Sequence, residues 1–148
     1  MTNVDTILFP VDLSEASPSL VPWVRVVAEK FGAKVHVLFV ARVMDYYAGL
    51  YVPHPSIANF EAEIVQGAEK KLSEFVTEHM AGLNVKALVR PGYPAEEILL
   101  YAESQTVDMI IIGTHGRKGL ERIIFGSVAE HVVKHSKVPV MTVNPYRK

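Results

Sequence analysis

Glycine, serine and basic residues gather in one stretch of the sequence, between residues 113 and 127. Gly113 and Gly116 open it, and Gly126 and Ser127 close it after nine intervening residues. A buried strand is predicted just before it, and a helix with Ser127 as its N-cap just after it. A glycine-rich turn between a strand and a helix presents backbone N–H groups and the positive end of a helix dipole to anions. The stretch therefore predicts a phosphate site.

The residue types fit this chemistry. Glycine lets a backbone approach a ligand closely or adopt a positive φ. Ser127 adds a hydroxyl donor, and Arg117, Lys118 and Arg122 bring positive charge into the stretch. Basic side chains in loops are commonly solvated, so a glycine-rich surface loop without a ligand is the alternative that this stretch alone leaves open.

Three separated motifs resemble the ATP-binding branch of the universal stress protein family. Gly113-x-x-Gly116, nine residues and then Gly126-Ser127 match the nucleotide-binding signature of that branch. The opening Ile7-Leu8-Phe9-Pro10-Val11-Asp12-Leu13-Ser14 and the closing Lys137-Val138-Pro139-Val140-Met141-Thr142-Val143 also look like the family, so the resemblance covers essentially all 148 residues. It implies ATP binding, a sheet of strand order 3-2-1-4-5 and a homodimer formed through the last strand, Val138 to Val143.

An ATP site needs an apolar slot for the base, a polar group for the ribose and donors for the phosphates. Pro10, Val11 and Val40 end the first two predicted strands and are placed to clasp adenine. Asp12 is placed to accept from a ribose hydroxyl or to help hold a metal, and Mg²⁺ is expected to bridge phosphate oxygens.

The expected nucleotide-binding residues are Pro10, Val11, Asp12, Val40, Gly113, His115, Gly116, Arg117, Gly126, Ser127 and Val128. The resemblance supports Asp12, Gly113, Gly116, Gly126 and Ser127 most strongly. Three of the set also have ordinary explanations: Asp12 as a cap of the first helix, Val40 as a core residue and His115 as an exposed side chain. No catalytic residue and no protein-held metal are expected.

Apolar strand-like runs alternate with amphipathic helix-like runs along the whole chain, as in βα units. They predict an α/β fold: one doubly wound domain over residues 1–148, with a five-stranded parallel sheet and four helices on both its faces. Strands are predicted at about 5–11, 34–41, 85–89, 107–112 and 138–143. Helices are predicted from a cap at Ser14 or Ser17 to Gly32, at about 56–81, at about 94–105 and from Ser127 onward.

In a doubly wound sheet, ligands bind beyond the carboxyl ends of the strands where the winding direction reverses. With the implied strand order, this point lies between the first and fourth strands, which end at Asp12 and Gly113. The glycine-rich stretch and the topology therefore predict the same crevice.

Composition and charge limit the partners and the chemistry that the sequence predicts. A formal net charge of −1 gives no global reason to expect nucleic acid or an anionic membrane as a partner. The absence of cysteine excludes disulfides and thiolate chemistry. No stretch approaches the roughly 18 apolar residues of a membrane span, and no secretion signal opens the chain. A soluble, cytoplasmic protein is expected.

Competing motifs are weak. The P-loop and G-x-G-x-x-G patterns do not occur, and Gly116-Arg117-Lys118-Gly119 matches the RNA-gripping GXXG loop only outside its usual context between helices. His131 and His135 share a helix face, as metal ligands can, but without cysteine or an obvious third ligand a zinc site is not favoured.

No nucleophile, base and orienting residue are arranged for covalent catalysis, so nucleotide binding with at most slow hydrolysis is expected. The protein would act as a nucleotide-dependent stress-response or signalling module. The alternatives are a genuine ATPase or nucleotide hydrolase, and a nucleotide-independent dimeric interaction protein. Residues 42–55 form the longest irregular segment; its three tyrosines suggest a lid or a contact surface, although aromatic residues more often anchor such a loop.

Overall fold

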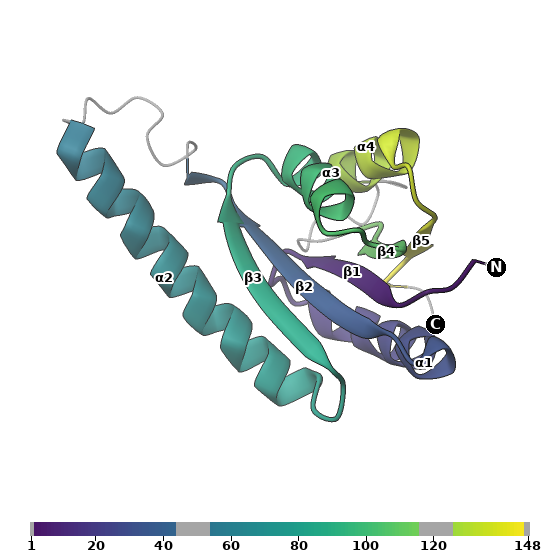
Figure 1. The fold of residues 1–148 in the computed structure, drawn as a ribbon. Coiled ribbons are helices and arrows are strands. Elements are labelled where there is room, and N and C mark those ends of the chain that lie inside the picture. Colours follow the sequence, from purple (N-terminus) through teal and green to yellow (C-terminus); the bar gives the residue numbers. More distant parts are fainter. Residues whose placement is uncertain (1, 44–53, 116–125, 147–148) are drawn as a thin grey trace.

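The computed structural model describes residues 2–43, 54–115 and 126–146. Five parallel strands form one sheet in the order β3-β2-β1-β4-β5, as the resemblance implied (Figure 1). The strands are β1 (Thr6–Val11), β2 (Lys34–Ala41), β3 (Val85–Pro91), β4 (Met109–Gly113) and β5 (Val140–Val143). The described helices are η1 (Ser17–Leu20, 3-10), α1 (Val21–Phe31), α2 (His54–His79), α3 (Pro94–Ser104) and α4 (Ser127–His135).

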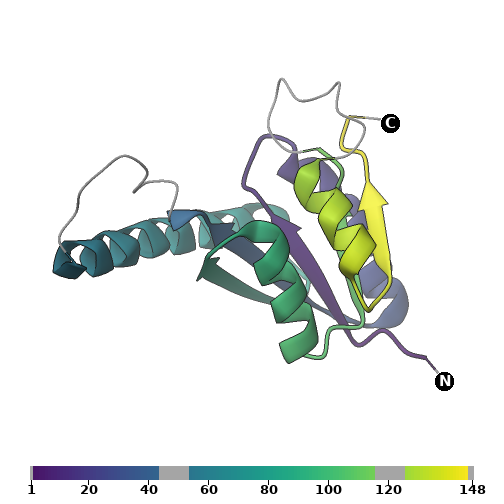
Figure 2. The same ribbon diagram turned by 90° about the horizontal axis from the view of Figure 1, so that it is seen from above.

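Helices cover both faces of the sheet, as the alternating pattern predicted. One buried cluster joins the sheet to α1 and α2, and a second joins the opposite face to α3 and α4. Figures 1 and 2 show α3 and α4 together on one side, α1 on the other and α2 running along the β3 edge. The parallel sheet is thereby buried on two sides, which explains its near-continuous apolar strands.

Two expectations about the start of α1 were wrong. Neither Ser14 nor Ser17 caps it, because the 3-10 turn η1 intervenes and α1 begins at Val21 with Leu20 in the N-cap position. The Ser17 hydroxyl instead donates to the Asp12 carboxylate at the end of β1. At the other end the prediction is confirmed: Gly32 terminates α1 in the left-handed conformation, with φ 65°.

Other boundaries differ by a few residues. Helix α2 begins at His54 and ends at His79, so the expectation that Pro55 excludes a helix was wrong; proline is tolerated in a first turn, where its missing N–H is not needed. Strand β3 continues to Pro91. Strand β5 begins only at Val140, since Pro139 has no N–H, although its carbonyl still accepts from Ile110. The tyrosines predicted as a lid lie between residues 46 and 51, outside the described residues.

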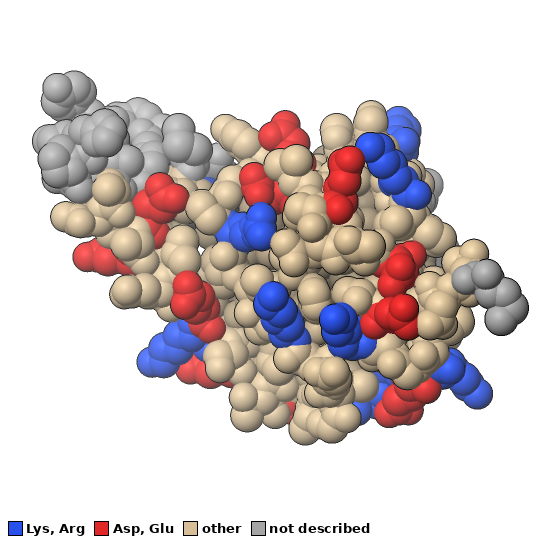
Figure 3. All heavy atoms as spheres, viewed as in Figure 1, with Lys and Arg blue, Asp and Glu red and all other residues tan. Residues whose placement is uncertain are grey.

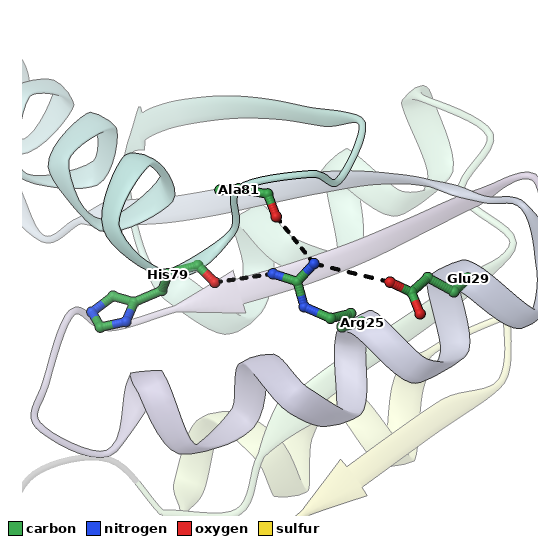
Figure 4. A network of polar contacts seen from close by, with 4 residues as sticks. All are labelled: Arg25, Glu29, His79 and Ala81. Carbon is green, nitrogen blue, oxygen red and sulfur yellow. Dashed lines mark hydrogen bonds and ion pairs between the residues drawn. The ribbon is translucent and has the colours of Figure 1, made fainter.

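Arg25 of α1 fixes the carboxyl-terminal end of α2 (Figure 4). Its guanidinium donates to the carbonyl of Ala81 at 3.1 Å and to that of His79 at 3.3 Å, and it lies 4.0 Å from the Glu29 carboxylate. The last carbonyls of a helix have no partner within the helix, so a cation that donates to them both satisfies and neutralises that end. Arg25 therefore holds α1 and α2 together on one face of the sheet.

The charged surface is mixed. On the face seen in Figure 3, basic and acidic side chains are interspersed, and this face shows no extended patch of one sign. Within the described ranges, no helix combines the length and apolarity of a membrane span.

Arg25→Ala is expected to lower the free energy of unfolding by about 1–2 kcal/mol, because two carbonyls lose a charged donor. Urea unfolding measures the change. Glu29→Gln is the control and should cost less than about 0.5 kcal/mol, since an exposed ion pair contributes little. Equal costs for the two variants would mean that the ion pair, and not the capping of α2, is what Arg25 contributes.

Candidate functional site

The paired register of β1 and β4 ends before the carboxyl ends of these two strands, and the region beyond its last pair is called the opening below. Strand β1 pairs with β2 along its whole length, from Thr6 to Val11, but with β4 only at Ile7 and Leu8. The carbonyl of Asp5 accepts from β2, and that of Thr6 accepts from Asp108 just before β4. Along a strand, the N–H and C=O groups of successive residues point to opposite sides, so the backbone groups of residue 10 point toward β4. Residue 10 is a proline and has no N–H to donate. The β1–β4 ladder therefore stops short of the strand ends.

This opening lies where the winding reverses, because β2 and β3 lie on one side of β1 while β4 and β5 lie on the other. Extended at the same offset, the register of β1 and β4 brings Gly113 level with Val11. Val40 lies one residue beyond the partner of Val11 on β2. Pro10, Val11 and Val40 are all buried, and the Val40 side chain belongs to the cluster beneath α3 and α4.

Asp12 stands exposed just after β1. Its Oδ1 accepts from the Ser14 N–H at 3.0 Å and from the Ser17 hydroxyl at 3.1 Å. These bonds turn the chain sharply, and Leu13 between them adopts a left-handed φ of 59°, which is uncommon for a residue with a branched side chain. Asp12 thus orders the turn before η1 rather than capping α1. Both described bonds use Oδ1, which leaves Oδ2 for a further donor.

Gly113 and Gly126 both lie where a side chain would crowd atoms of the protein itself. Neither has a positive φ. A Cβ on Gly113 would lie 2.9 Å from Cδ1 of Leu20, and a Cβ on Gly126 would lie 3.1 Å from the carbonyl oxygen of Thr114. Glycine at both positions therefore allows the chain to pack closely on itself.

Backbone hydrogen bonds hold Gly126 against the end of β4. The Thr114 N–H donates to Val143 of β5 at 2.9 Å, and the Gly126 N–H donates to Thr114 at 2.7 Å. His115 is buried beside them; its Nδ1 lies 2.8 Å from the Thr114 hydroxyl, and its ring meets that of Tyr146 edge-on. The exposed position considered for His115 is therefore wrong.

The start of α4 carries backbone donors that the helix itself does not use. Gly126, with φ −66° and ψ 150°, holds the N-cap position that the sequence assigned to Ser127, and it has no side chain with which to cap the helix. The first backbone bond of the helix runs from the Glu130 N–H to the Gly126 carbonyl. The N–H groups of Ser127, Val128 and Ala129 consequently have no acceptor within the helix. They point out of the positive end of the α4 dipole, which suits an anion.

The ends of β1, β2 and β4 are neighbours in the sheet, and the start of α4 is tied to the end of β4. The predicted residues on these segments are Pro10, Val11, Asp12, Val40, Gly113, His115, Gly126, Ser127 and Val128. Val11 and Val40 lie on opposite faces of the sheet, because Val11 packs in the cluster with α1 and α2 and Val40 in the cluster with α3 and α4. Gly116 and Arg117 lie outside the described residues. The sequence reasoning missed the closeness of Leu20 to Gly113 and the left-handed φ of Leu13, because neither residue type signals it. It also missed that Pro10 ends the ladder, although a proline inside a central strand is itself such a signal.

A hydrogen-bonded pair of polar side chains is buried on the α3 side of the sheet. Nδ1 of His36 on β2 shares a hydrogen bond of 2.7 Å with the hydroxyl of Tyr101 on α3, and the Arg90 guanidinium lies 4.9 Å from the Tyr101 ring centre. Burial lowers the pKa of His36, and the positive charges of Lys86 and Lys34 lower it further. Burial raises the pKa of Tyr101, against the opposing effect of Arg90. Burial therefore favours the neutral form of both side chains.

These features define a doubly wound α/β domain with an open helix N-terminus at its switch point. The model of the universal stress protein family matches residues 3–144. The universal stress protein MJ0531 of Methanocaldococcus jannaschii is 34% identical, over 96% of this chain and 83% of its own length. The chain belongs to the universal stress protein family.

Solved structures agree on the fold. That of the protein MJ0577, also from Methanocaldococcus jannaschii, has a TM-score of 0.82 and 30% identity, covering 97% of this chain and 96% of that one. A family protein from Arabidopsis thaliana, solved with AMP bound, has a TM-score of 0.61 at 20% identity, over 95% of this chain and 91% of that one. The second likeness concerns the fold alone.

Gly113→Ala is expected to lower the free energy of unfolding by about 1–3 kcal/mol, because its Cβ overpacks against Leu20. In a Leu20→Val background the obstructing Cδ1 methyl is gone, and the same substitution should cost clearly less, although a contact of 3.3 Å with the His115 carbonyl oxygen remains. A double-mutant cycle by urea unfolding measures the coupling. Equal costs in both backgrounds would show that Leu20 is not the reason for glycine here.

Stability is expected to fall with pH below about 6.5 through His36. Its pKa is lower in the folded than in the unfolded chain, so the unfolded chain takes up the proton first. The contribution is complete above pH 6.5 and is lost as the pH falls toward the lowered pKa. Urea unfolding between pH 7.5 and 5.0 should show a smaller decline for His36→Gln than for the unsubstituted protein. The same decline in both would assign the effect to other histidines.

Proposed function

We propose that this protein binds an adenine nucleotide, with ATP as the expected ligand, in the opening between β1 and β4. The observation that carries the proposal is the meeting of two features at one place. The ladder beside β1 ends early, and three N–H groups without helix acceptors lie at the start of α4. The first would let a ligand lie beside apolar residues, and the second would supply donors for phosphate oxygens.

Adenine is the proposed base because a protein of the same fold was solved with an adenine nucleotide. The Arabidopsis thaliana protein with the same fold was solved with AMP bound, and the family match covers nearly the whole of this chain. Adenine would lie against Val11 and Val40, and the ribose hydroxyls would donate to the Asp12 carboxylate. Gly113, His115, Gly126, Ser127 and Val128 would surround the phosphates, joined by Gly116 and Arg117 from the segment between them.

Magnesium would come with the nucleotide. Among the described residues, no group of three or more histidine and acidic side chains is arranged to hold a metal ion. Mg²⁺ keeps several waters and commonly binds through substrate phosphates and one or two carboxylates. Asp12 is the carboxylate at this opening, so any protein contribution to Mg²⁺ would come from there.

The biological role we propose is that of a cytoplasmic stress-response or signalling module whose state depends on bound nucleotide. Hydrolysis would be slow, because the described site offers positioned donors but no arranged catalytic base. A homodimer through β5 is part of the proposal. Strand β5 is an edge of the sheet, and an apolar edge strand exposes backbone groups that a second copy can pair.

Ser127→Asp is expected to weaken ATP binding at least tenfold, since a carboxylate would face the phosphates. The same change should leave the free energy of unfolding unchanged or raise it by about 0.3–1 kcal/mol, because an acidic residue in a first turn complements the helix dipole. Calorimetry with ATP, ADP and AMP, with and without Mg²⁺, measures affinity, and urea unfolding without nucleotide measures stability. Protein freed of co-purified nucleotide is used throughout.

Ser127→Asn is the matched control, because it has the size of aspartate without the charge, and it should keep ATP affinity within a few-fold. ATP at 100 times its Kd should stabilise the unsubstituted protein by about 2.7 kcal/mol. Equal binding by the aspartate and asparagine variants would place the phosphates elsewhere. No stabilisation by any nucleotide would favour the nucleotide-independent interaction protein. Steady ADP release with Mg²⁺, lost in Asp12→Ala, would favour a genuine ATPase.

A further inference from the structure

Strand β3 is the edge of the sheet opposite β5, and among the described residues only β2 pairs with it. The Asn84 carbonyl, just before β3, accepts from the N–H of Val35 on β2 at 2.8 Å. The backbone groups of successive residues in a strand point to opposite sides. Val85, Ala87 and Val89 therefore point their N–H and carbonyl groups away from β2. An edge with such unpaired groups can accept a further strand.

A groove of about 530 Å³ lies beside this edge, between β3 and α2. Figure 1 shows α2 following the β3 edge. The groove is lined by Glu69, Leu72, Ser73, Val76 and Thr77 of α2 and by Ala87, Leu88 and Val89 of β3. An edge strand beside a helix provides backbone partners on one side and contacts for alternate side chains on the other. This arrangement binds extended peptides as an added strand.

Two basic side chains lie along the same edge, on the α3 side of the sheet. The Arg90 guanidinium lies 4.9 Å from the Tyr101 ring centre, which places Arg90 on that side. Lys86 is four residues earlier in the strand and shares its face, because side chains alternate along a strand. Within the described ranges, neither Lys86 nor Arg90 has a carboxylate partner. This side of the edge therefore carries positive charge that the protein itself does not neutralise.

This charge disfavours a second copy of β3 as the occupant. Two β3 strands paired about a two-fold axis would bring Lys86 and Arg90 of both copies onto one face, and like charges on neighbouring strands destabilise a sheet. Lysine on an edge strand commonly opposes such self-pairing. Acidic side chains on an added strand would complement both cations.

The α2 side of the edge favours different side chains. Leu72 and Val76 give the groove an apolar lining, and Glu69 is the acidic residue that lines it. An acidic side chain turned toward α2 would meet Glu69, whereas an apolar one would pack against the two aliphatic side chains. Since successive side chains of a strand point to opposite faces, the complementary segment alternates acidic and apolar residues.

We propose that the β3 edge binds an extended segment of a partner protein in which acidic and apolar side chains alternate. The segment pairs with the outward backbone groups of β3. Its acidic side chains lie beside Lys86 and Arg90, and its apolar side chains lie in the groove against α2. Strand β2 separates this edge from β1, so the proposal does not depend on the nucleotide site.

The probe is a capped peptide of seven residues, the length of β3, that alternates glutamate and valine. It is titrated into the full-length protein up to about 1 mM and followed by calorimetry. Amide hydrogen exchange should slow at Val85, Ala87 and Val89 and stay unchanged in β5. Ala87→Pro should weaken binding at least tenfold, because it removes an outward N–H and leaves the bonds to β2 in place. Ala87→Ser is the matched control, keeps the N–H and should bind within about twofold of the unsubstituted protein.

Lys86→Glu tests the charge separately, and because Lys86 is exposed, it serves even if Ala87→Pro fails to fold. It should weaken binding of the glutamate peptide at least tenfold and favour an otherwise identical peptide that alternates lysine and valine. Lys30→Glu, an equal charge change at an exposed position of α1, is the control and should keep affinity for the glutamate peptide within about twofold. Circular dichroism of each variant checks the fold.

Four results would overturn the proposal. The first is no binding of the glutamate peptide up to about 1 mM. The second is equal binding by the unsubstituted protein and by folded Ala87→Pro or Lys86→Glu. The third is slowed exchange in β5 in place of β3. The fourth is a dimer that Ala87→Pro abolishes, which would assign the edge to a second copy.

Discussion

The missing N–H of Pro10 shapes the functional end of this molecule. Strand β1 is buried along its whole length and pairs with β2 throughout, so it cannot leave the sheet. Toward β4 it pairs only at Ile7 and Leu8. A proline in a central strand normally weakens the sheet, because it cannot donate a ladder hydrogen bond. Here the lost donor lies at the switch point, where a fully paired ladder would fill the space that a ligand of an α/β sheet uses.

The other side of the opening depends on close backbone packing. Gly126 donates to Thr114, and Thr114 donates to Val143, so the start of α4 is tied through the end of β4 to the edge strand β5. A Cβ at residue 126 would press on the Thr114 carbonyl. Glycine thus allows the close approach that holds the start of α4 at the end of β4. The packing of the protein on itself is therefore one reason for glycine at residue 126.

The topology could be predicted from the sequence because it depends on features with clear signals. Apolar runs of β-branched residues mark the strands, Gly32 marks the end of α1, and three motifs imply the strand order. The details at the site depend on contacts between residues far apart in the chain, which carry no local signal. Nothing in the sequence indicates that Leu20 fills the space above Gly113 or that Ser17 turns back to Asp12. The N-cap was misplaced by one residue because serine is the commoner cap, while packing against Thr114 requires glycine.

The dipole of helix α4 acts at both of its ends. Its first turn carries N–H groups and partial positive charge, and its last turn carries Lys134 and His135 at the partially negative end. An anion at the start and a cation at the end are both favoured by the same alignment of peptide groups. The helix has only nine residues, and isolated helices shorter than about 12–15 residues are marginal. An anion bound at its start would therefore stabilise a segment that otherwise depends on packing through Ala129 and Val132.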